Sequence, residues 1–138
     1  MFGKASLLLD TDIFINYLRG QSEEAELIRR IIFNEEFNGF YSAITEIELY
    51  SVERMSLEQE KKIKILLSSL QRIELNSPVA QLAGRLIARY RKNNGLEMPD
   101  AVIAASAVIV NASLVSKNIK HFSYIPGLVL SPPDAYSY

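Results

Sequence analysis

The chain of 138 residues contains no cysteine, no tryptophan and a single histidine. The absence of cysteine excludes disulfides, thiolate zinc sites and cysteine nucleophiles, and it fits a reducing compartment. No uncharged apolar run reaches the roughly 18 residues that a membrane-spanning helix needs, and the apolar run before Asp10 is too short for a secretory signal. We therefore expect a cytoplasmic protein with no membrane partner.

Positive charge is not in excess. The chain has 15 lysines and arginines against 16 aspartates and glutamates, which gives a net charge of −1. Such a composition provides no overall attraction for polyanions. Any binding of nucleic acid must therefore come from a local basic patch or from metal ions.

Apolar residues, in contrast, make up 49% of the sequence. This share is enough to form one compact core, and no internal repeat or linker-like stretch divides the chain. We expect a single domain over residues 1–138, in which residues 131–138 form an extended C-terminal tail.

Short apolar strands alternate with helical segments along the chain. Strands are expected at residues 6–10, 40–43, 72–75, 113–116 and 128–130, and helices at 12–19, 22–33, 44–52, 57–70, 78–92 and 101–110. This alternation predicts an α/β fold, with a central, mostly parallel sheet of four to five strands and helices on both faces. Ligands of such sheets bind beyond the carboxyl ends of the strands, where Asp10, Ser42 and Ser116 fall.

Acidic residues follow the predicted strands or open the predicted helices. Asp10 ends the first strand, where a carboxylate is costly unless it faces a cleft, a helix N-terminus or a cation. Glu48 follows Thr45 by three residues, and Asp100 precedes a long uncharged run. Each has a structural alternative: Asp10 as a helix cap, Thr45 with Glu48 as a capping box, and Asp100 as a first-turn residue.

Taken together, these three acids point to a shared cation. Carboxylates brought to one edge of a sheet repel one another and take up protons unless a cation lies between them. A hard, oxygen-preferring ion such as Mg²⁺ or Mn²⁺ fits a chain without cysteine and with one histidine. Such an ion can activate water and bind a phosphodiester oxygen, which lets an acidic protein act on an anionic substrate.

Five short motifs span almost the whole chain. They are Leu8-Leu9-Asp10-Thr11-Asp12, Ser42-Ala43-Ile44-Thr45-Glu46-Ile47-Glu48-Leu49, Pro99-Asp100 with the apolar run after it, Leu114-Val115-Ser116-Lys117-Asn118-Ile119-Lys120-His121-Phe122, and Gly127-Leu128. In this order and spacing they resemble the PIN-domain ribonucleases and, within them, the VapC-like toxins of type II toxin–antitoxin pairs. The resemblance implies a PIN-like fold and a metal-dependent endoribonuclease that hydrolyses RNA and leaves a 5′-phosphate and a 3′-hydroxyl.

The same resemblance assigns roles to particular residues and predicts partners. It makes Asp10, Glu48 and Asp100 the catalytic acids that bind Mg²⁺ or Mn²⁺, with Glu46 as the alternative to Glu48. It also implies a homodimer and a small antitoxin that covers the acidic cleft with its own chain.

Two positions depart from the family's pattern. Asp12 stands where the family often has asparagine, and it either supports the metal site or serves as a first-turn helix residue. Asn118 stands near the place of a fourth acid, so it would be a neutral, weaker metal ligand.

Several polar residues near the expected site keep two interpretations. Thr11, Ser42 and Ser116 could orient metal ligands or substrate, or serve as turn and cap residues. The basic stripe, which we define as Arg85, Arg89 and Lys92, either contacts RNA phosphates or forms a solvated helix face. His121 is interpreted as a surface residue.

Two other functions compete with the nuclease. The segment Leu8-Leu9-Asp10-Thr11-Asp12 also resembles the first motif of haloacid-dehalogenase-like phosphatases, in which Asp10 would be the nucleophile and Asp12 the general acid. The late acidic pair of that family is missing here. The second competitor is a PIN-like module that binds RNA or protein without cleaving anything, which the missing fourth acid suggests.

Overall fold

The computed structural model describes residues 3–137, and a parallel sheet of five strands lies at its centre. The strands are β1 (Ser6–Leu9), β2 (Asn38–Ser42), β3 (Gln71–Ile73), β4 (Ser113–Val115) and β5 (Leu130–Ser131). Their order in the sheet is β3-β2-β1-β4-β5, and every neighbouring pair is parallel. The predicted α/β class and strand number are confirmed, although β5 begins two residues later and ends one residue later than expected.

Helices connect the strands. They are α1 (Thr11–Leu18), α2 (Ser22–Ile32), α3 (Ala43–Tyr50), α4 (Leu57–Ser68), α5 (Ser77–Asn94) and α6 (Met98–Val110), with short 3₁₀ helices η1 (Ile119–His121) and η2 (Pro133–Tyr136). The ends of these helices are set by capping residues. Ser56 and Gln59 form a capping box before α4, and Gly95, at φ 71°, ends α5 in the left-handed conformation. No helix within residues 3–137 is both long and apolar enough to cross a membrane.

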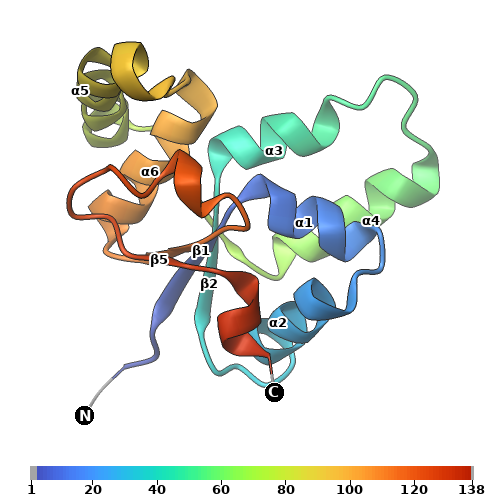
Figure 1. Cartoon of the computed structure of the whole chain (residues 1–138). Coiled ribbons are helices and arrows are strands. Elements are labelled where there is room, and N and C mark those ends of the chain that lie inside the picture. Colours follow the sequence, from blue (N-terminus) through green and yellow to red (C-terminus); the bar gives the residue numbers. More distant parts are fainter. Residues whose placement is uncertain (1–2, 138) are drawn as a thin grey trace.

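The alternation of side chains along β1 divides the interior into two cores. Leu8 packs with α5 and α6 on one face of the sheet, whereas Leu7 and Leu9 pack with α1, α2 and α4 on the other. Figure 1 shows the two groups of helices on opposite sides of the sheet. Because β1 is covered on both faces, it is apolar at three successive positions, as central parallel strands are.

Helix α6 is the most deeply buried helix. Residues 101–107 are all buried, and the Ser106 hydroxyl satisfies its hydrogen-bonding need by donating to the Val102 carbonyl at 2.7 Å. The helix begins at Met98 instead of Ala101, because Pro99 is accommodated in its first turn. Asp100 therefore lies inside the first turn of α6.

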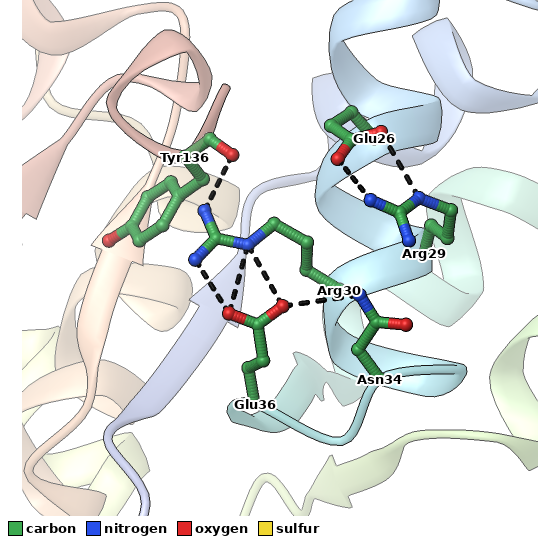
Figure 2. A network of polar contacts seen from close by, with 6 residues as sticks. All are labelled: Glu26, Arg29, Arg30, Asn34, Glu36 and Tyr136. Carbon is green, nitrogen blue, oxygen red and sulfur yellow. Dashed lines mark hydrogen bonds and ion pairs between the residues drawn. The ribbon is translucent and has the colours of Figure 1, made fainter. Parts of the chain in front are cut away.

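The C-terminal segment differs from the extended tail that the sequence suggests for residues 131–138. Ser131 belongs to β5, and Pro133–Tyr136 forms η2, which packs on α2. The buried Arg30 guanidinium donates from Nη1 to the Tyr136 carbonyl at 2.7 Å and forms an ion pair with Glu36 at 2.7 Å (Figure 2). Phe37 contacts the Tyr136 ring edge-on, so a polar and an aromatic contact hold the segment against the domain. Tyr138 lies outside the described residues.

Gly39 in β2 provides a test of how closely this strand packs against α2. A Cβ at this position would lie 2.6 Å from Cγ2 of Ile31 on α2 and 2.6 Å from Cδ2 of Leu70. The β-branched Ile31 has little freedom at χ1 in a helix, so it cannot easily move away. We expect Gly39→Ala to lower the free energy of unfolding by roughly 1–3 kcal/mol, measured by urea denaturation.

Gly84→Ala is the matched control. Gly84 is exposed in α5 and a Cβ there would meet nothing within 4 Å, so alanine should stabilise the protein by about 0.5–1 kcal/mol. Equal effects of the two substitutions would contradict the described contact between β2 and α2.

Candidate functional site

Three adjacent strands end at one edge of the sheet with a polar residue each. Asp10 follows β1, Ser42 ends β2, and Ser116 follows β4. Because these strands are neighbours and parallel, their carboxyl ends lie together. The Asp10 backbone N–H donates to the Val115 carbonyl at 3.0 Å, so the Asp10 backbone is held against the end of β4.

Asp10 is buried, with 6% of its surface exposed, and it caps α1. Its Oδ1 accepts the Thr11 backbone N–H at 2.8 Å, and its Oδ2 accepts the Ser116 hydroxyl at 2.7 Å. Burial raises the pKa of the Asp10 carboxyl and the nearby Glu48 charge adds to this, whereas the bonds from Ser116 and Thr11 lower it. The cap and the site interpretations are therefore both compatible with the geometry.

Glu48 reaches the same edge from α3. Thr11 donates from its hydroxyl to Glu48 Oε1 at 2.6 Å and lies 2.9 Å from the Thr45 hydroxyl. The predicted capping box of Thr45 and Glu48 is wrong, because α3 starts earlier and Ser42 is its N-cap, accepting the Ile44 N–H at 3.2 Å. Thr45 and Glu48 instead share a helix face that contacts Thr11.

Asp100 approaches from the opposite core, in the first turn of α6. Burial raises the pKa of its carboxyl, and the charges of Asp10 and Glu48 act in the same direction, while His121 lowers it. His121 Nδ1 lies 3.7 Å from Asp100 Oδ2, and the imidazole is largely exposed. The sequence placed His121 on the surface, and its contact with the acid could not be read from spacing.

The charges of the three acids act on one another. Among residues 3–137, no lysine or arginine forms an ion pair with Asp10, Glu48 or Asp100. Oxygen-only donors and uncompensated negative charge fit Mg²⁺ or Mn²⁺. In the described part of the chain, however, no three or more acidic or histidine side chains are already arranged around one point that could hold a metal ion. The donor chemistry fits a metal, while the enclosing geometry is not pre-formed.

Asp12 ties α1 to the loop after β4. Its Oδ2 accepts the Lys117 backbone N–H at 3.2 Å and the Asn118 side-chain amide at 3.1 Å, while the Asn118 N–H donates to the Ser116 hydroxyl oxygen at 2.9 Å. Burial, together with the neighbouring Asp10 charge, raises the pKa of Asp12 to about 6. Asp12 thus orients Asn118, and the amide group of Asn118 faces this carboxylate.

A second contact on the same loop was missed by the sequence analysis. Lys117 Nζ lies 3.2 Å from Oε2 of Glu24 and 3.7 Å from Oε2 of Glu23, both at the start of α2. Glu24 is fully buried and its Oε1 has no partner among the described protein atoms. Lys117 lies far from Glu23 and Glu24 in the sequence, so only the fold reveals this contact.

Comparison with known proteins places the chain in a family. The family model of the PIN domain matches residues 7–128. "Ribonuclease VapC19" of Mycobacterium tuberculosis is 32% identical over 130 residues, which cover 91% of this chain and 98% of the relative. The chain belongs to the PIN-domain family, among the homologues of the VapC ribonucleases. "Ribonuclease VapC2" of Rickettsia felis is 33% identical over 97 residues, which cover 67% of this chain and 72% of the relative.

Solved structures of other proteins share the fold. VapBC2 from Rickettsia felis, bound to a DNA fragment from its promoter, matches with a TM-score of 0.77 and 26% identity over 92% of this chain and 98% of that one. A toxin–antitoxin complex from Klebsiella pneumoniae matches with a TM-score of 0.71 and 27% identity, over 92% and 97% of the two chains. The expected PIN-domain fold and VapC-type ribonuclease family are confirmed, and this membership favours the nuclease over the phosphatase interpretation.

The pKa of Asp12 leads to a prediction about metal-free protein. A carboxyl whose pKa is raised on folding binds protons more tightly in the native state, so it stabilises the protein at low pH and loses that contribution as pH rises. In EDTA, the unfolding free energy should therefore fall between about pH 4 and pH 7 more steeply for the wild type than for Asp12→Asn.

Urea denaturation at several pH values provides the measurement. Subtracting the unfolding free energy of Asp12→Asn from that of the wild type at each pH removes the contributions of the groups that both proteins share. Parallel pH profiles for the two proteins would contradict the raised pKa of Asp12.

Proposed function

We propose that this protein is a metal-dependent endoribonuclease that hydrolyses RNA phosphodiester bonds and serves as the toxin of a toxin–antitoxin pair. The observation that supports this proposal is that the charges of Asp10 and Glu48 act on Asp100 at the carboxyl edge of the sheet, while no lysine or arginine within residues 3–137 forms an ion pair with any of the three. An acidic site of this kind needs a cation before it can accept a polyanion.

Asp10, Glu48 and Asp100 would hold Mg²⁺ or Mn²⁺, with the side-chain carbonyl of Asn118 as an additional neutral ligand. When bound, the ion supplies an activated water for in-line attack on phosphorus and stabilises charge on the leaving oxygen, so that a 5′-phosphate and a 3′-hydroxyl are left. Asp12 orients Asn118 through the bond at 3.1 Å. The Asn118 side chain that would bind the ion is thus held in place by another residue.

The neighbouring hydroxyl groups position the acids. Ser116 holds Asp10 Oδ2, and Thr11 holds Glu48 Oε1 while its own backbone N–H holds Asp10 Oδ1. Ser42 acts at a distance, since it caps the helix that carries Glu48. These contacts support the expectation that Thr11, Ser42 and Ser116 orient the site.

The choice of Glu48 over Glu46 rests on their partners. Glu46 Oε1 lies 3.0 Å from Arg72 Nη1 on β3, so it is engaged by an ion pair at the edge of the sheet. Glu48 instead contacts Thr11, next to Asp10, and its charge acts on both Asp10 and Asp100. This supports Glu48 as the metal-binding glutamate.

Partners follow from the relatives. The Klebsiella pneumoniae relative is a toxin–antitoxin complex, and VapBC proteins from Salmonella typhimurium have been solved bound to DNA. We extend this to the present chain, which would form a homodimer and bind a small antitoxin that covers the acidic edge. As a ribonuclease it would act in the cytoplasm.

Removal of single acids tests the assignment. With Mn²⁺, the wild type should cut single-stranded RNA. Asp10→Asn, Asp100→Asn and Glu48→Gln should each lower the cleavage rate by more than about a hundredfold, because losing a direct ligand costs more than losing its supporting contacts.

Glu46→Gln is the matched control and should cleave RNA nearly as fast as the wild type. Circular dichroism checks that each variant keeps the native spectrum. Undiminished cutting by Asp10→Asn or Asp100→Asn would reject the roles of these acids, and a wild type that binds RNA without cutting it would support the silent binding module.

Asn118 is tested by adding the charge that the family often has nearby. Asn118→Asp should lower the Mn²⁺ concentration for half-maximal activity, because a carboxylate binds a divalent ion more tightly than an amide does. The measurement is a titration of activity with Mn²⁺. An unchanged half-maximal concentration would remove Asn118 from the ligand set.

A further inference from the structure

A small polar cavity of about 200 Å³ lies directly beside Asp100. It is formed where α5 ends, where α6 begins and where η1 passes, and Asp100 itself is part of its lining. His121 also lines it and lies 3.7 Å from the Asp100 carboxylate. Any group bound in this cavity would therefore be next to Asp100, one of the three candidate metal acids.

The lining side chains offer three kinds of contact. Lys120 provides an exposed cation, and it takes part in none of the ion pairs found within residues 3–137. Tyr124 provides a half-buried aromatic ring, held by a tilted contact with Tyr90 at 5.1 Å between ring centroids. Glu97 provides a carboxylate at the entrance of α6.

Glu97 is unusual for its position. It occupies the N-cap of α6, yet its side chain makes no capping hydrogen bond. Serine, threonine, aspartate and asparagine at the N-cap stabilise a helix by accepting one of its free backbone N–H groups. Glu97 does not provide this stabilisation to α6. Its exposed carboxylate is available to accept hydrogen bonds from a group in the cavity.

One residue of the basic stripe, Arg89, is connected to the lining of this cavity through two aromatic rings. The Arg89 guanidinium lies 5.6 Å from the centroid of the Tyr90 ring, and Tyr90 in turn contacts Tyr124. Proteins bind single-stranded nucleic acid with alternating cationic and aromatic side chains. The cations pair with phosphates, and the bases stack on the aromatic rings. This arrangement favours the RNA-binding interpretation of the stripe.

We propose that this cavity binds the nucleotide of single-stranded RNA next to the phosphodiester that is cut. This inference rests on the proposed function and adds a specificity site to it. Lys120 contacts the phosphate, the Tyr124 ring stacks on the base, and Glu97 accepts N–H groups from the base edge. Guanine is the preferred base, because it presents two adjacent N–H donors to a carboxylate.

The test separates binding from cleavage. Fluorescence anisotropy measures the binding of labelled single-stranded RNA, with guanine or uracil at one position, to Asp10→Asn in Mn²⁺. On this background we introduce Tyr124→Leu, Tyr124→Phe, Lys120→Ala and Glu97→Gln. Lys61→Ala on α4, which packs against the other face of the sheet, is the matched control.

Each variant has its own expected result. Tyr124→Leu should weaken binding by roughly five- to a hundredfold, while Tyr124→Phe keeps it. Lys120→Ala should reduce the slope of log affinity against log salt by about 0.7. Glu97→Gln should abolish the preference for guanine and leave uracil-containing RNA bound as before.

The proposal is overturned if Lys120→Ala and Glu97→Gln both behave like Lys61→Ala, or if the Asp10→Asn parent binds no RNA. Lys120 and Glu97 are exposed, so these two variants keep the test valid even if Tyr124→Leu fails to fold. If the wild type cleaves RNA but the cavity variants bind RNA as tightly as their parent does, the proposed nucleotide site is wrong and the proposed nuclease function stands. If the protein binds RNA with a preference for guanine but the wild type does not cleave it, the proposed nuclease function is wrong and the proposed nucleotide site stands.

Discussion

The structure depends on an electrostatic constraint at the carboxyl edge of its sheet. Asp10 is almost fully buried there, and the charges of Glu48 and Asp100 act on the same small region. Burial and mutual repulsion raise the pKa values of Asp10 and Asp100, so the apo site holds negative charge at a cost. A bound divalent ion would remove that cost, and this would explain how an acidic arrangement can serve an enzyme that acts on RNA.

The surrounding fold keeps this unfavourable arrangement in place. The two apolar cores fix the strands that carry Asp10 and Ser116, and the deeply buried α6 fixes Asp100. On the open side, the loop after β4 is held twice, by Asp12 on α1 and by the ion pair of Lys117 with buried Glu24. Rigid elements therefore carry the acids, and polar contacts orient the loop that completes the site.

The sequence predicts the fold better than it predicts the contacts of the site. Strand β1 and Asp10 follow from an apolar run that ends in an acid, and α5 follows from its proline start and glycine end. The sequence suggested a capping box for Glu48, which is wrong because α3 begins at Ala43 and Ser42 is its N-cap. The bonds of Asp12 to Asn118 and of Glu24 to Lys117 join residues distant in sequence, so no local pattern could indicate them. The segment after β5 was misjudged for the same reason, because its partner Arg30 lies on α2.

The most direct test is to locate a bound ion. Crystals of the wild-type protein grown with Mn²⁺ would show, by anomalous scattering, whether manganese is bound and by which oxygens. The account predicts a peak in contact with Asp10 and with at least one of Glu48 and Asp100. Ordered carboxylates at this edge with no manganese between them, or manganese bound only elsewhere, would contradict it.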